Sequence, residues 1–125
     1  APTNSNKFVW VKMFNTVDLY QFAGDLYKNA VREVELRTVI NRAYYSAFLS
    51  VRDIAKITNS SGSVHQEVLN YTDKRTDLDI FNQLKQLRKL RIDADYKLNV
   101  EISKRDAAKS LKLAQYILKT LNYLP

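Results

Sequence analysis

The chain has 125 residues, of which 46% are apolar, and it contains only two glycines and two prolines. This length suits one domain with one core, and the scarcity of helix-breaking residues favours an all-α fold. The absence of cysteine and the single histidine, His65, exclude disulfides, thiolate chemistry and a multi-histidine metal site within one chain, so we expect no metal or cofactor.

The formal net charge of +7 favours anionic partners such as nucleic acid, a nucleotide or an acidic protein. No apolar run is long enough to cross a membrane, and no signal-peptide pattern is present. We therefore expect a cytoplasmic protein without a membrane partner.

Residues 1–15 are predicted to form a flexible N-terminal extension, and residues 16–125 a single helical domain. The first residues are small and polar, and residues 8–11 form a short apolar run of strand-like composition. The first helix is predicted from near Thr16, an acceptable N-cap, to Asn29 or Ala30. Its apolar face consists of Leu19, Phe22, Ala23, Leu26 and Tyr27.

The second helix is predicted to be the longest, from about Glu33 to Ile57. An i, i+3, i+4 pattern gives it a continuous core face. This face consists of Leu36, Val39, Ile40, Ala43, Ala47, Val51 and Ile54. Residues 59–63, Asn-Ser-Ser-Gly-Ser, predict a loop, and a short third helix follows from about Val64 to Tyr71.

The fourth helix is predicted from about Thr76 to Leu98. Ser103 then predicts the N-cap of a fifth helix, with Asp106 three residues later as in a capping box. The apolar stripe of this last helix consists of Ala107, Leu111, Ala114, Leu118 and Leu121. Substantial helices with short connections predict an antiparallel bundle of four to five helices, and no repeat or linker divides the chain.

Arg91 interrupts the apolar stripe of the fourth predicted helix. At helical spacing it lies on the same side as Ile80, Leu84, Leu87, Ala94 and Leu98. An unpaired buried guanidinium is costly, so Arg91 is expected either to be paired or to face a cleft. Asp95 lies one turn further on and can pair with it. Such a pair either fixes the packing of two helices or belongs to a binding site.

The second predicted helix carries the run Arg42-Ala43-Tyr44-Tyr45-Ser46-Ala47-Phe48. Adjacent residues point about 100° apart on a helix, so at most one of the two tyrosines faces the core squarely. Either they pack in the core with a hydroxyl at its rim, or they stack on bases and contact phosphate beside Arg42.

Charged residues on the fourth predicted helix offer few catalytic arrangements. Arg88, Arg91 and Asp95 form a ridge of alternating charge, in which Arg88 is expected to face solvent. Asp93 and Asp95 are too close in sequence to share a helix face, which argues against a paired-carboxylate site.

His65 lies just after the predicted loop, and a lone histidine is more often a surface or helix N-terminal residue than a catalyst.

Together these residues resemble the HEPN domain, a helical-bundle family named for nucleotide binding in higher eukaryotes and prokaryotes. Residues 42–48 resemble its signature R-A-Y-Y-x-x-F, and residues 90–96, Leu-Arg-Ile-Asp-Ala-Asp-Tyr, resemble the L-R-x-x-A-D-Y signature of its small prokaryotic branch. His65 stands in a region where such proteins often carry histidine. The resemblance covers roughly residues 16–124, and two motifs in the right order make it fairly specific.

The resemblance implies a homodimer whose protomers meet around the arginine helix and form a basic cleft. It also implies RNA or a nucleotide as the ligand, and a minimal nucleotidyltransferase as a partner in a toxin-antitoxin or defence-type system. Many HEPN proteins are metal-independent endoribonucleases with an R-x4-6-H motif, in which the arginine steadies the phosphate and the histidine transfers protons. In this chain Tyr96 occupies the histidine position, and Ile92 follows Arg91 where nucleases usually have a polar residue. A tyrosine is a poor general base at neutral pH.

Three hypotheses follow, and we favour the first. It is a HEPN-like binding module that has lost catalysis and holds RNA or a nucleotide through Arg42, Tyr45, Arg88, Arg91, Asp95 and Tyr96. The second is an endoribonuclease toxin that uses Arg91 with Tyr96 or His65. The third is a structural dimerisation domain in which the pair of Arg91 with Asp95 only fixes packing.

Overall fold

The computed structural model describes residues 13–59, 61–74 and 78–125. Within these residues it contains five helices and no strand, which confirms the all-α prediction. The helices are α1 (Val17–Asn29), α2 (Glu33–Ala55), α3 (Val64–Lys74), α4 (Leu78–Tyr96) and α5 (Lys104–Thr120). Most of the predicted N-terminal extension and the predicted start of the fourth helix at Thr76 lie outside the described residues. None of the described helices combines the length and apolarity needed to cross a membrane.

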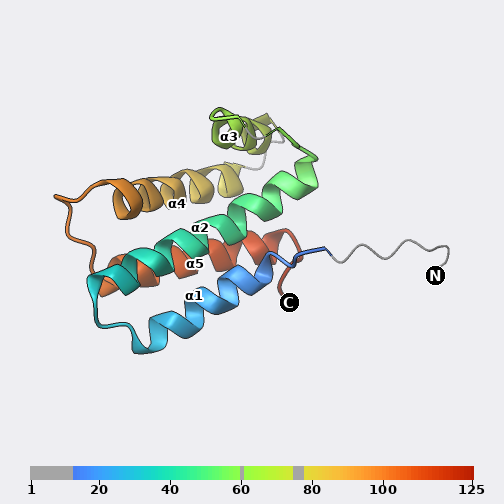
Figure 1. Cartoon of the computed structure of the whole chain (residues 1–125). Helices are drawn as coiled ribbons and strands as arrows, with labels where there is room; N and C mark the ends of the chain where they lie inside the picture. The colour runs from blue at the N-terminus through green and yellow to red at the C-terminus, as the bar shows by residue number, and fades with distance from the viewer. Residues whose placement is uncertain (1–12, 60, 75–77) are drawn as a thin grey trace.

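Helix α2 is the centre of the bundle, because it contacts each of the other four described helices. Helices α1, α2, α4 and α5 run alternately in opposite directions, whereas α3 lies at one end against α2 and α4 (Figure 1). The expected antiparallel bundle is therefore confirmed. The start of α1 and the C-terminus lie at the same end of the bundle (Figure 1).

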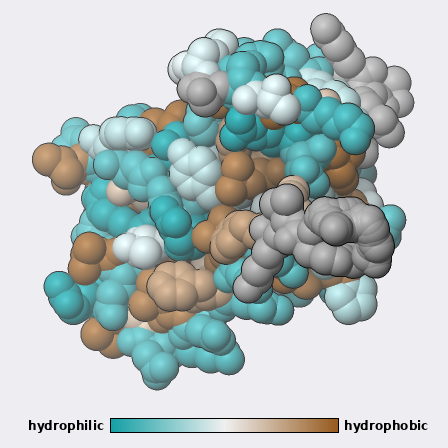
Figure 2. Space-filling view, turned by 45° about the vertical axis from the view of Figure 1, so that its right-hand side comes forward, coloured by the Kyte–Doolittle hydropathy of each residue, from teal (hydrophilic) through white to brown (hydrophobic). Residues whose placement is uncertain are grey.

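The core is built mainly from the predicted apolar stripe of α2. Its fully buried side chains include Val39, Ile40, Ala43, Tyr44, Ala47 and Val51. Leu84 and Leu87 of α4 and Ile117 and Leu118 of α5 pack into the same core or border it. The face of the molecule shown in Figure 2 is largely hydrophilic, with apolar side chains in separate groups.

Local signals place most helix ends where the sequence predicts them. The Ser103 hydroxyl accepts a hydrogen bond from the Asp106 amide, and the Asp106 carboxylate accepts one from the Ser103 amide, so the predicted capping box is present. Thr16 is the N-cap residue of α1, but its hydroxyl lies 2.6 Å from that of Ser50. The Asn15 side chain instead accepts the hydrogen bond from the Val17 amide. Thus the position of this cap is confirmed, whereas its side-chain chemistry differs.

Three side chains predicted to be buried are exposed, and in each case the bundle explains why. Leu98 is 92% exposed because α4 ends at Tyr96, before the predicted stripe is complete. Ile54 is exposed in the last turn of α2, and Ile57, beyond the helix end, packs against the core instead. Phe22 is exposed because α1 contacts only α2 and α5, so a narrower face of α1 is covered than the pattern predicts.

Candidate functional site

Arg91 of α4 is buried, with only 9% of the residue exposed, and it is paired as predicted. Its Nε donates to Asp95 Oδ2 over 2.9 Å, one turn further along the helix. Its Nη2 donates to the hydroxyl of Tyr45 on α2 over 2.9 Å and to that of Tyr96 over 3.3 Å. The guanidinium therefore joins α4 to the tyrosine motif of α2.

Three aromatic rings surround the Arg91 guanidinium. Its Cζ lies 5.5 Å from the ring centroid of Tyr44, 5.2 Å from that of Tyr45 and 5.3 Å from that of Tyr96. These distances allow cation–π attraction, which is strongest where water is excluded. Tyr44 is buried and Tyr45 is half-buried, so only one of the two adjacent tyrosines faces the core squarely, as predicted.

Asp95 is held by a second donor that the sequence analysis missed. The Asn41 side-chain nitrogen donates to Asp95 Oδ2 over 2.8 Å, so the same oxygen accepts from Asn41 and Arg91. Asn41 stands four residues before Tyr45 and seven before Phe48 on α2. That helical spacing was the available signal that Asn41 shares a face with the tyrosine motif.

His65, in the first turn of α3, packs directly on this motif. Its ring stacks on Phe48 with centroids 4.4 Å apart, and its Nδ1 lies 2.7 Å from the Tyr44 hydroxyl. The Tyr45 ring meets it edge-on, with centroids 6.1 Å apart. The expected position at a helix N-terminus is confirmed, but the ring is half-buried rather than freely exposed.

The surroundings of His65 keep it neutral near pH 7. Burial lowers the pKa of His65, and the positive charges of Arg91, Arg88 and Arg52 lower it further. Burial also raises the pKa of Tyr44, so its phenol stays protonated. The contact between these two residues is therefore a neutral hydrogen bond.

Comparison with known proteins identifies the family. The sequence model of the HEPN domain matches residues 23–124, which is most of the chain. This chain belongs to the HEPN domain family. No curated protein and no solved structure gave a match. Both signature runs of the HEPN resemblance, residues 42–48 and 90–96, lie inside the matched region, and their side chains meet across the α2–α4 contact.

The remaining candidate residues of this HEPN domain border the Arg91 cluster. By the Arg91 cluster we mean Asn41, Tyr44, Tyr45, His65, Arg91, Asp95 and Tyr96. Arg88 is half-buried rather than solvated, and its Nη1 donates to Gln66 of α3 over a long 3.4 Å. Arg42 lines a separate hollow with Phe22 and Val34, and Asn41 and Asp95 border that hollow as well.

Arg37 of α2 fixes the end of α4 that carries Asp95 and Tyr96. Its guanidinium donates to the backbone oxygens of four residues at and beyond this end, Asp93, Ala94, Lys97 and Val100. Glu33 accepts a further bond from Arg37 Nε over 2.9 Å. The Asp93 oxygen also accepts from the Lys97 amide, and the Lys97 oxygen also accepts from the Val100 amide. Arg37 therefore reinforces this end of α4 and ties it to α2, as a positioning residue of the candidate site.

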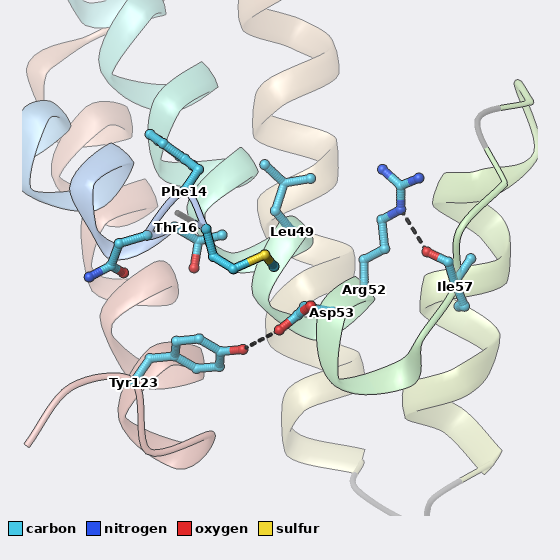
Figure 3. Close-up of a pocket in the computed structure, with 9 residues that line it drawn as sticks. Phe14, Thr16, Leu49, Arg52, Asp53, Ile57 and Tyr123 are labelled. Carbon is cyan, nitrogen blue, oxygen red and sulfur yellow. Dashed lines mark hydrogen bonds between the residues drawn. The ribbon is translucent and has the colours of Figure 1, made fainter. Parts of the chain in front are cut away.

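A separate hollow of about 600 Å³ lies at the end of the bundle where the described chain begins and ends (Figure 3). Several of its polar lining groups already have protein partners: the Tyr123 hydroxyl donates to Asp53, and Arg52 Nε donates to the Ile57 oxygen. It shares no lining residue with the Arg91 cluster. We therefore place the candidate site of this HEPN domain at the Arg91 cluster.

Proposed function

We propose that this HEPN domain binds RNA or a nucleotide at the Arg91 cluster without cleaving it. The observation that supports binding most directly is the set of hydrogen bonds that Arg91 makes. Nε and Nη2 donate to Asp95, Tyr45 and Tyr96, whereas Nη1 has no acceptor among the described residues. Nη1 is not fully buried, so it reaches solvent.

An open Nη1 beside tyrosine hydroxyls suits a phosphate group. Guanidinium donors bind phosphate oxygens through charge-assisted hydrogen bonds. The Tyr96 side chain is largely exposed, and its hydroxyl lies within hydrogen-bond distance of Arg91. A phosphate oxygen can therefore accept from both residues, while the tyrosine rings offer surfaces for a base.

The state of His65 argues against proton abstraction at this cluster. The buried Tyr44 hydroxyl needs an acceptor, and the acceptor that the described residues provide is His65 Nδ1. With Nδ1 accepting, the neutral ring carries its proton on Nε2, which then donates to an anion rather than acting as a base. Tyr96, in the position of the family's usual histidine, is also a poor base near pH 7.

One observation favours a second candidate, a metal-independent endoribonuclease. The fold brings His65 of α3 against Tyr44 and Phe48 of α2. There the positive charge of Arg91 acts on the His65 ring and lowers its pKa. If Tyr44 accepts rather than donates, Nε2 is free to act as a general base. Incubation of the protein with RNA in chelator distinguishes the two candidates, because only the second yields cleavage that Arg91→Lys abolishes.

A homodimer is the assembly that we propose for this function, with a minimal nucleotidyltransferase as a partner in a toxin-antitoxin or defence-type system. Exposed apolar side chains surround the site: Phe22 and Val34 line the hollow that Asp95 borders, and Tyr96 and Leu98 follow on the α4 side. Exposed aromatic and aliphatic groups of this kind mark interaction surfaces. Sedimentation equilibrium that finds only monomer at tens of micromolar would contradict the dimer.

The test of binding compares Arg91→Ala with Arg91→Lys and with Arg105→Ala, an exposed arginine on α5. Loss of a phosphate contact weakens RNA or nucleotide affinity by about 1–3 kcal/mol. Arg91→Lys keeps the charge but loses the planar donor fork, so it weakens binding too. Loss of the pair with Asp95 should cost about 3–5 kcal/mol of stability in either case. If that pairing is the only role of Arg91, the folded fraction of Arg91→Ala binds as the wild type does. A binding titration and a urea denaturation curve decide.

A further inference from the structure

We propose that the ligand is a single-stranded polynucleotide rather than a mononucleotide, and that it continues from the Arg91 cluster into a basic groove between α3 and α4. This inference rests on the proposed function. Helix α3 packs against α4 at one end of the bundle (Figure 1). The groove between them has a volume of about 470 Å³.

The groove combines an apolar floor with a basic rim. Leu69 of α3 and Phe81 and Ile92 of α4 supply the floor. Four cations line it, against one carboxylate, Asp93, so the lining carries a net positive charge. The cations are Lys85, Arg88, Lys89 and Lys97. Positive grooves with apolar or aromatic surfaces are typical of single-strand binding, in which phosphates meet the cations and bases meet the rings.

The rim cations are weakly engaged by the protein. Lys89 and Lys97 both pair with Asp93, over 3.3 and 3.1 Å, but their side chains are 77% and 50% exposed. The Asp93 side chain is only 15% exposed, but it pairs with two lysines whose ammonium groups reach solvent, so a phosphate can contact either lysine while the other stays paired with Asp93. Lys85 lies over the Phe81 ring, with its Nζ 5.8 Å from the ring centroid.

Arg88 connects the groove to the Arg91 cluster. It lines the groove, stands three residues before Arg91 on α4, and donates to Gln66, the residue that follows His65. Its Nε is buried without an acceptor in the described part of the chain, and its bond to Gln66 is long. An arginine whose donors have such poor protein acceptors is suited to donate hydrogen bonds to a phosphate.

The spacing of the cations requires a ligand longer than one phosphate group. Lys85 and Arg91 are six residues apart on α4, which corresponds to about 9 Å along the helix axis. A strand that contacts Arg91, Arg88 and Lys85 in turn therefore presents at least two phosphates. A nucleoside monophosphate bound at the Arg91 cluster has only one.

The experiment measures binding of a labelled oligouridine of about 12 nucleotides and of uridine monophosphate. The variants are Lys85→Ala/Lys89→Ala in the groove, Arg91→Lys in the cluster, and Lys109→Ala/Lys112→Ala as a charge-matched control on the exposed face of α5. We expect the groove variant to bind the oligouridine about tenfold more weakly than the wild type does. The slope of the logarithm of its binding constant against the logarithm of salt concentration should be smaller by about one. Its affinity for the monophosphate should equal that of the wild type. Unchanged denaturation midpoints establish that it is folded.

Each other outcome has a distinct meaning. Equal affinity of the wild type for both ligands, or an equal loss in the α5 control, overturns the groove while leaving the proposed function intact. No binding of either ligand overturns the proposed function itself. If a glutamate-rich amphipathic peptide competes with the oligouridine for the wild type but not for the groove variant, and binds more tightly, the groove serves a protein partner and the inference is wrong.

Discussion

The Tyr44 hydroxyl lies 2.7 Å from His65 Nδ1, and this contact joins the middle of α2 to the first turn of α3. Tyr44 and His65 are 21 positions apart in sequence, so the fold, and not their sequence separation, brings them together. The contact fixes His65 near Arg91. Both side chains are neutral, and a proton on His65 Nδ1 would remove the acceptor of the Tyr44 hydroxyl. The contact therefore links the protonation state of His65 to the packing of α3 on the bundle.

The first prediction concerns the pH dependence of stability. Burial and the nearby arginines lower the pKa of folded His65 below its ordinary value of about 6.5, so the unfolded chain binds the proton more readily. The free energy of unfolding should therefore fall as the pH decreases through about 6.5 toward the lower folded pKa. Urea denaturation at about pH 7.5 and about pH 5.5 measures this, and His65→Gln should show a weaker dependence in that window.

A direct measurement is available because His65 is the only histidine in the chain. Its ring protons should give a single set of proton resonances that titrate with pH. A midpoint at or above the ordinary histidine pKa would show that the surrounding arginines do not act on it as described.

The second prediction is that Tyr96→His creates ribonuclease activity that the wild type lacks. The substitution restores a histidine five residues after Arg91, on the exposed side of the cluster. An imidazole with a pKa near 6.5 exchanges protons at neutral pH, which the Tyr96 phenol does not. The measurement is cleavage of single-stranded and structured RNA in chelator.

The double variant Tyr96→His/Arg91→Lys is the control for that experiment and should be inactive, because the arginine is expected to steady the phosphate. Strong metal-independent cleavage by the wild type, abolished by Arg91→Lys, would instead favour His65 as the base and the endoribonuclease hypothesis.

The third prediction concerns Asp95, whose Oδ2 accepts from both Arg91 and Asn41. Asp95→Ala leaves a buried guanidinium without its counter-charge, which should cost about 3 kcal/mol of unfolding free energy. The matched control is Asp25→Ala, which breaks an exposed pair with Lys28 and should cost less than about 1 kcal/mol. Equal effects of the two substitutions in urea denaturation would show that the Arg91 pair is not effectively buried.

The helical fold could be predicted from the sequence because its signals are local. Helical periodicity, the capping box of Ser103 with Asp106, and the pairing of Arg91 with Asp95 all involve residues within one turn of each other. Burial was less predictable because it depends on which neighbours cover a face. Phe22 has the spacing of a core residue, yet no described helix covers it.

The candidate site likewise has features that local sequence signals predict and features that depend on helix packing. The signature runs and the Arg91–Asp95 pair could be identified from spacing, whereas the contact between His65 and Tyr44 depends on how α3 docks against α2 and α4. The roles of Asn41 and Arg37 also depend on the α2–α4 contact, because their acceptors lie more than fifty positions away in sequence. Periodicity places these residues on a helix face but does not identify the partner helix.

The last prediction is that Arg37→Ala destabilises the fold and weakens ligand binding through the end of α4. Arg37 donates to the Ala94 oxygen over 2.9 Å and to backbone oxygens on either side of it, and its side chain is only 18% exposed. Charge-assisted hydrogen bonds of this kind contribute about 1.5–3 kcal/mol, so we expect a loss of about 2–3 kcal/mol of unfolding free energy. Arg37→Lys should recover part of it, since an ammonium reaches fewer of these carbonyls.

Hydrogen exchange separates this positioning role from a general loss of stability. Once Arg37 is removed, the amides of the last turn of α4 should exchange faster than those of α5, whose capping box of Ser103 with Asp106 does not involve Arg37. Asp95 and Tyr96 lie in that last turn, so the same change should loosen the Arg91 cluster and reduce affinity for RNA or a nucleotide. Uniformly faster exchange in α4 and α5 would mean that Arg37 supports the bundle as a whole and has no particular part in positioning the site.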